Sequence, residues 1–342
     1  MPVSRADDDI NAEGLRRLFF FWQGAKRSKS VRREIADLIE QSAAIPSVPQ
    51  VVVRFLEITQ DPQFDYGKLV DLLASDPGMT GEILRLANSA LFGVSRQITS
   101  IRQAMTLLGV RRIRSLVLAR YLISVINDRS AVLDVRYFWR RSLTSAALAA
   151  KLARHRLASL QEETFIAALL ADVGIVLMAK ALGEDYRPIA ECYVPGGVGE
   201  TASLEQERFG TTHGEVTALL LDRWQLPTLI IDTGKYHHGE PPADAEPNVT
   251  TMVQLVSAAD GLAKHLCESH DVATLVDACH RCMEAAGVNM SMLPAILEEL
   301  EEDIADLARV LRVAVLPERV YERIVHEIRE HLSAPAGQGP SF

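Results

Sequence analysis

The chain has 342 residues, 48% of them hydrophobic and 24% charged, a composition typical of a soluble globular protein of one large or two smaller domains. A net charge of −9 argues against a protein built to coat nucleic acid or an acidic membrane, and four cysteines do not form a disulfide scaffold. No apolar run approaches the roughly 18 residues of a membrane span, and the acidic start "MPVSRADDDI" lacks the apolar segment of a signal peptide. We therefore expect a cytoplasmic protein without a transmembrane segment.

Residues 1–39 read as an N-terminal extension. Within residues 15–33, the aromatic run "FFFW" precedes the basic stretch "KRSKSVRR". The aromatic side chains are expected to pack on the globule while the basic residues stay solvated. The alternative is a segment that binds a partner or a membrane surface, because aromatic and basic residues together suit an interface.

Helical periodicity dominates from residue 49 onward, and no segment shows the alternation of a strand. Asp65, Asp76 and Ser100 stand where N-caps are expected, with Pro77 at the first helical position after Asp76. Further helical patterns cover 110–127, 134–155, 161–182, 202–224, 227–237, 249–268, 271–286, 292–310 and 317–332. We expect an all-α protein in which the acidic run 298–306 is the solvated face of a helix. The tail 333–342 is expected to be disordered.

The stretch 100–122 resembles a DNA-binding helix-turn-helix, with Arg111, Arg112 and Arg114 opening its second helix. Its turn is one residue too long, and the second helix is apolar along "SLVLARYLISVI". We therefore expect a core helix and no nucleic-acid binding.

Three of the cysteines gather in 265–282, where Cys267, Cys279 and Cys282 accompany His265, His270 and His280. A zinc site is one interpretation. Because Cys279 and Cys282 are neighbours on one helical face and no second C-x-x-C follows, we expect buried free thiols instead.

The stretch "AALLADVGIVLMA" places one carboxylate, Asp172, in an apolar helical pattern. His213, the pair His237–His238, and Asp260 also lie on or at the end of apolar helical patterns. Helices of a bundle can direct such groups into one pocket, and carboxylates with imidazoles suit iron, manganese or zinc. The alternative is that each is a separate capping or surface group.

Several blocks, in order, resemble the HDOD family, the signalling-output branch of the HD metal-dependent phosphohydrolase superfamily. The matching strings are "IPSVPQVVVRFLEI", "LLASDPGMTGEILRLANSALFG", "ITSIRQAMTLLGVRRIRSLVLA", "FWRRSLTSAALAAKLA", "FIAALLADVGIVLMA", "HGEVTALLLDRWQLP" and "YHH". The resemblance implies an N-terminal helical lobe over 40–130 and an HD-like helical lobe over 131–268. Helices over 269–332 then form a C-terminal extension.

The resemblance also implies where a metal site has degenerated. HD phosphohydrolases hold metal with an upstream His, an adjacent His-Asp pair and a distant Asp, and two-metal relatives add a His and a His-His pair. Here Arg141 stands at the upstream His and Ala171 at the His of the pair. Asp172, His213, His237, His238 and Asp260 keep ligand-type residues, so the resemblance implies a vestigial pocket with no cofactor and no catalytic residue.

A buried carboxylate still needs a positive partner. We expect Arg141 to replace the metal by pairing with Asp172, with Asp260, or with both. Alternatively, Arg141 points to solvent and Asp172 is held by backbone N–H groups or by a histidine.

The resemblance favours a non-enzymatic regulatory module acting through protein contacts in a bacterial signalling pathway. One alternative is a residual metal-dependent phosphohydrolase acting on a nucleotide or cyclic nucleotide. Another is a nucleotide receptor that uses the old active-site pocket. The partner, the pathway and the oligomeric state, a homo-oligomer included, stay open.

Overall fold

The computed structural model describes residues 54–55, 58–59, 64–88, 97–110, 113, 117, 132–197, 199–224, 226–268, 272–311 and 313–315. The expectations for residues 15–33, for Arg111, Arg112 and Arg114, and for 317–342 lie outside these ranges.

The described residues form helices and connecting turns and contain no strand, which confirms the predicted all-α class. The helices are α4 (Tyr66–Ala74), α5 (Pro77–Ala87), a helix over 101–110, α7 (Val135–Arg156), α8 (Gln161–Leu170), α9 (Val173–Leu182), α10 (Arg187–Ala190), α11 (Thr201–Phe209), α12 (His213–Arg223), α13 (Thr228–Tyr236), α14 (Pro247–Glu268), α15 (Val272–Ala286), α16 (Leu293–Glu298) and α17 (Leu300–Leu311).

The predicted N-caps of the first helices are present. The Asp65 carboxylate accepts the backbone N–H groups of Gly67 and Lys68, and the Asp76 carboxylate accepts that of Met79 at 3.0 Å. The Ser100 hydroxyl accepts the N–H of Gln103 at 3.2 Å. These side chains satisfy donors that have no partner inside a helix.

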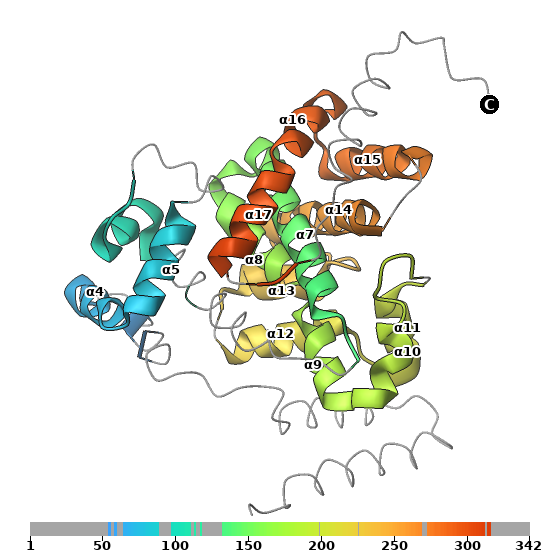
Figure 1. The fold of residues 1–342 in the computed structure, drawn as a ribbon, viewed down its shortest axis with the longest axis horizontal. Helices are drawn as coiled ribbons and strands as arrows, with labels where there is room; N and C mark the ends of the chain where they lie inside the picture. Colours follow the sequence, from blue (N-terminus) through green and yellow to red (C-terminus); the bar gives the residue numbers. More distant parts are fainter. Residues whose placement is uncertain are drawn as a thin grey trace, which may run out of the picture.

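Helix α7 is the centre of the larger lobe, and every residue from Tyr137 to Ala153 is buried. It packs against α8, α14 and α17, while α12 packs on α9 and α13. Helices α4 and α5 stand to one side of this lobe (Figure 1). Since α17 contacts both α7 and α5, it joins the two parts.

Helix α17 is held to α7 by ion pairs, so the acidic run predicted to be the solvated face of a helix is solvated only in part. Buried Arg140 donates two hydrogen bonds to Glu301, at 3.1 and 2.7 Å. Buried Lys151 lies 2.8 Å from carboxylate oxygens of both Glu299 and Asp303. The run 298–306 therefore supplies partners for two buried cations, which would be costly to leave unpaired.

Two predicted helices are interrupted at the positions that matter for the site. The pattern 161–182 divides into α8 and α9 at Ala171–Asp172, and the pattern 202–224 divides into α11 and α12 at Gly210–Thr212. Gly210 has φ 70°, a left-handed conformation that ends α11. Each break puts a polar residue, Asp172 or His213, at the start of a helix.

The stretch Ala158–Ala190 is long and apolar enough to cross a membrane, contrary to the expectation that no run approaches that length. Of its most apolar window, 94% is buried inside the protein. Its apolar side chains are thus used by the core.

The cysteines are free thiols, as predicted: Cys267, Cys279 and Cys282 are buried and Cys192 is half-buried. Within the described part of the chain, no cysteine belongs to a cluster of metal-ligand residues.

Candidate metal centre

The break between α8 and α9 presents Asp172 to the interior. Asp172 has φ −91° and ψ 4°, the bridge conformation that interrupts regular helix. Thr217 on α12 compensates for the break, because its hydroxyl accepts the N–H of Gly174 and donates to the carbonyl of Ala171, both at 2.9 Å. Backbone groups freed by the interruption are thereby satisfied in the core.

Two glycines bring the neighbouring helix ends close enough to share a site. A Cβ on Gly174 would lie 2.1 Å from the backbone oxygen of His213, and a Cβ on Gly214 would lie 2.8 Å from that of Lys235. The starts of α9 and α12 and the end of α13 therefore meet at backbone contact. His213 is the first residue of α12, and His237 caps the end of α13.

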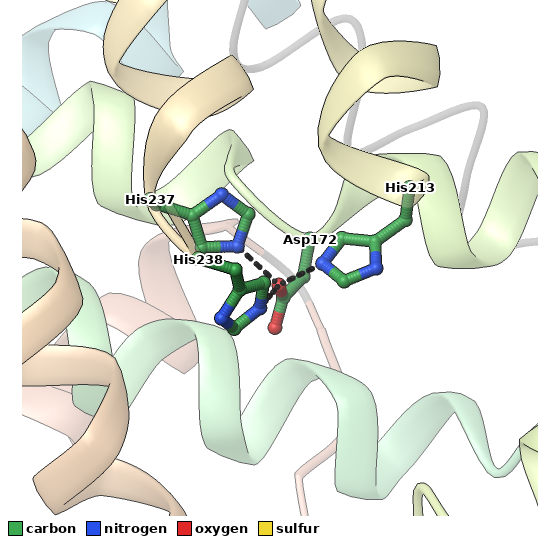
Figure 2. A group of neighbouring side chains, drawn as sticks. All are labelled: Asp172, His213, His237 and His238. Atoms are coloured by element: carbon green, nitrogen blue, oxygen red, sulfur yellow. Dashed lines mark hydrogen bonds and ion pairs between the residues drawn. The ribbon is translucent and has the colours of Figure 1, made fainter. Parts of the chain in front are cut away.

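Three imidazoles surround one carboxylate oxygen (Figure 2). The Nε2 atoms of His237, His213 and His238 lie 3.1, 3.4 and 3.9 Å from Oδ1 of Asp172. One ligand atom from each of the four residues lies within 4.8 Å of the others. The Tyr193 hydroxyl donates to the second oxygen, Oδ2, at 3.0 Å.

Arg141 and Asp260 form a separate ion pair beside this cluster. Nε and Nη2 of Arg141 donate to the two oxygens of Asp260 at 3.2 and 2.8 Å, and both side chains are buried. The guanidinium also lies over the Tyr193 ring, 4.8 Å from its centroid. Of the partners predicted for Arg141, the structure shows direct hydrogen bonds to Asp260. The six residues singled out in the sequence thus lie in one region as two groups.

Hydrogen bonds made by the Nδ1 atoms fix the orientations of the His213 and His237 imidazoles. Nδ1 of His237 faces the carbonyl oxygen of Gly234 at 2.7 Å, and Nδ1 of His213 faces the Glu205 carboxylate at 2.7 Å. Carbonyl and carboxylate oxygens only accept, so both Nδ1 atoms carry the proton. In neutral rings, the two Nε2 lone pairs then face Asp172. Lone pairs facing a carboxylate repel it unless a proton or a cation lies between them.

The buried groups of the site carry an excess of negative charge that a cation would neutralise. Asp172, Glu205 and Asp260 are buried with a single guanidinium, Arg141, which gives a net charge of −2 when the histidines are neutral. Burial alone would raise the pKa of Asp172, but the imidazoles of His213 and His237 and the Arg141 guanidinium lower it well below its usual range. His238 is partly exposed, with 28% of its side chain accessible, yet desolvation and the neighbouring histidines hold its pKa well below its usual value, which favours the neutral ring that can act as a ligand.

Two carboxylates act on the imidazole of His213. Burial lowers the pKa of His213, but the Glu205 and Asp172 carboxylates raise it more strongly, to about 10. A protonated ring between two carboxylates offsets part of the negative charge.

The residues present fit one divalent transition-metal ion. Ligand atoms about 2.1 Å from a tetrahedral ion lie about 3.4 Å from one another, close to the distances between Asp172 Oδ1 and the nearer imidazoles. His213 Nε2 is buried and lies 3.4 Å from Asp172 Oδ1, a spacing suited to two ligand atoms of one ion. Imidazoles with one carboxylate suit zinc, iron or manganese. Asp260 is taken by Arg141, so a second ion would lack that ligand.

The space beside the cluster is small. Its cavity has a volume of about 10 Å³ and is lined in part by Arg141, Tyr193, His213 and His238. This is room for about one water molecule. The larger groove, of about 680 Å³, lies between α14, α15 and residues 239–243 and is lined by none of the six residues.

Four residues of the site were missed in the sequence. Glu205 and Thr217 lie on helices whose polar positions look like solvated ones, and Tyr186 and Tyr193 lie between the predicted helical patterns 161–182 and 202–224. No spacing signal distinguishes them, because their role depends on the breaks in the helices.

The family model of the HDOD domain matches residues 45–240 of the chain. The chain belongs to the HDOD family. A crystal structure from Shewanella amazonensis, of a protein provisionally named a phosphohydrolase, has a TM-score of 0.60 and 20% identity, covering 80% of this chain and 97% of that one. A Marinobacter aquaeolei structure, provisionally named a signal transduction protein, has a TM-score of 0.54 and 17% identity over 91% of this chain and 68% of that one. At these identities both show the shared fold.

A curated relative of this HDOD chain is an uncharacterised protein of Treponema pallidum. It is 26% identical over 229 residues, which cover 64% of this chain and 42% of the relative. The chain thus spans less than half the length of that relative.

Proposed function

We propose that this HDOD chain is a non-hydrolytic regulatory module that acts through protein contacts in a bacterial signalling pathway. Its HD-like core would hold a single metal ion at Asp172, His213, His237 and His238. The observation that carries the proposal is the buried Arg141–Asp260 pair, with both carboxylate oxygens engaged at 3.2 and 2.8 Å. In the HD-type pattern that the sequence resembles, Arg141 would thereby place a permanent cation at a ligand position.

The single ion departs from the sequence-based expectation of no cofactor. That expectation rests on the two missing imidazoles at Arg141 and Ala171, whereas the four remaining residues have ligand atoms within 4.8 Å of one another. When bound, the ion would neutralise buried negative charge and join the ends of α12 and α13 to the start of α9. Such an ion stabilises the fold without any chemistry on a substrate.

The small volume of the cavity beside the cluster also supports a non-hydrolytic role. Hydrolysis of a phosphoester needs room for the phosphate and its attacking water next to the metal. A cavity of about 10 Å³ holds about one water molecule. The same observation disfavours a nucleotide receptor that uses this pocket.

A residual phosphohydrolase is the second candidate, favoured by the cluster of three imidazoles and one carboxylate. The deciding assay incubates the full chain with manganese, iron(II) or zinc and measures release of 4-nitrophenol from 4-nitrophenyl phosphate and from its bis ester. Hydrolysis of a cyclic dinucleotide is followed in parallel. We expect no turnover above that of Asp172→Ala. Turnover that Asp172→Ala abolishes would contradict the proposal and establish the hydrolase.

A further inference from the structure

Glu205 is a fully buried carboxylate that the HD-type ligand pattern does not include. It lies on α11, with a relative exposure of 0%. One oxygen accepts the hydroxyl of Tyr186. The other, Oε2, faces His213 twice, at 2.6 Å from the backbone nitrogen and 2.7 Å from Nδ1 of the ring. A buried carboxylate is costly unless its oxygens are engaged, and here two of the three contacts are to a single residue.

The two contacts to His213 fix the side chain in position and in tautomer. Holding the backbone N–H fixes the first turn of α12, where His213 is the first residue. Holding the Nδ1 proton leaves the lone pair on Nε2, which points at Asp172 Oδ1 from 3.4 Å. Without Glu205 the proton could reside on either nitrogen, and one of the two forms cannot bind a metal through Nε2.

We propose that Glu205 is the positioning residue of the metal centre, a carboxylate that orients His213 and increases the basicity of its Nε2 without touching the ion. The inference rests on the proposed function, because it requires an ion at Asp172, His213, His237 and His238. Carboxylates behind ligating histidines have this effect in other metal sites, and their loss costs 10–100-fold in metal affinity.

The test is a cobalt(II) titration of the full chain followed by visible absorption, which reports the ligands and geometry around the ion. We expect Glu205→Gln to bind cobalt roughly 10–100-fold more weakly than wild type and with an altered spectrum. Glu207→Gln is the matched control, since Glu207 is an exposed residue of the same helix. This control should bind within about twofold of wild type, because surface substitutions away from a site have small effects.

The outcomes separate this inference from the proposed function. If wild type binds no cobalt, both the metal centre and the role of Glu205 are overturned. If wild type binds cobalt and Glu205→Gln has the same affinity and spectrum, only the role of Glu205 is overturned. The spectrum is needed because a purely structural loss would lower the bound fraction without changing the coordination.

A measurement on the wild type covers the case in which Glu205→Gln does not fold. In the zinc-loaded chain, ¹H–¹⁵N spectra of the imidazoles should show His213 protonated at Nδ1, with its proton shifted downfield by the carboxylate. A His213 ring protonated at Nε2 would overturn the proposal.

Discussion

At the scale of single residues, the centre of the protein is organised by which charges face each other. The carboxylates of Asp172, Glu205 and Asp260 and the guanidinium of Arg141 are buried in this region. Both oxygens of Asp260 accept hydrogen bonds from Arg141. Asp172 is left to the imidazoles and to the Tyr193 hydroxyl. A substitution at Arg141 therefore removes the only permanent positive charge among these four groups.

Arg141→Met should destabilise the protein by about 3–5 kcal/mol, the usual cost of removing one partner of a buried ion pair. The free energy of unfolding is measured by denaturant titration. Arg309→Met is the matched control, because Arg309 pairs with Asp306 on the surface and surface substitutions change stability by less than about 0.5 kcal/mol. Equal effects of the two substitutions would show that the Arg141–Asp260 pair does not stabilise the core.

The cysteines should differ sharply in reactivity. Burial raises the pKa of the Cys279 and Cys282 thiols to about 12, so at pH 8 both are protonated and unreactive, and Cys267 is buried as well. A thiol titration of the native chain should find one accessible thiol, Cys192, and four after denaturation. More than one rapidly reacting thiol in the folded chain would contradict the burial of the other three.

At the scale of helices, the site depends on two interruptions that periodicity does not predict. The patterns 161–182 and 202–224 each read as one continuous helix, and the first contains the largely apolar stretch "FIAALLADVGIVLMA". The break at Ala171–Asp172 becomes favourable only in three dimensions, where Thr217 satisfies the freed groups of Ala171 and Gly174. The ligand-type residues of the site were therefore predictable from the sequence. The residues that hydrogen-bond to those ligands, Glu205 and Tyr193 among them, were not.

Gly174→Ala tests the close approach of α9 to α12. The added methyl would lie 2.1 Å from the His213 carbonyl oxygen, so we expect a loss of stability of about 1–3 kcal/mol, as for other overpacked cores. Because the methyl would push α9 away from α12, Asp172 and His213 would move apart, and we expect the chain to bind metal more weakly.

Gly261→Ala is the control for that substitution, because a Cβ at this helical position meets nothing within 4 Å. It should leave stability unchanged or raise it by up to about 1 kcal/mol, through the higher helix propensity of alanine. If Gly174→Ala is as stable as Gly261→Ala, the helix ends do not meet as described.

At the scale of the whole molecule, the all-α architecture followed from the sequence because capping residues and helical periodicity agree along most of the chain. Asp65 and Asp76 cap the helices that they were expected to cap. The role of α17 did not follow, since an acidic helix face reads as solvated until Arg140 and Lys151 are found buried beneath it. Long-range pairs of this kind leave no local signal.

We propose that the HD-type site of this protein has become a one-metal site closed by Arg141. Elemental analysis of the full chain, after incubation with zinc, iron(II) or manganese and removal of free metal, tests it most directly. We expect one ion per wild-type chain and none in Asp172→Ala, which lacks the carboxylate ligand. Two ions per wild-type chain would mean that Arg141 does not replace a metal ligand, and no ion at all would mean that the four residues do not form a metal site.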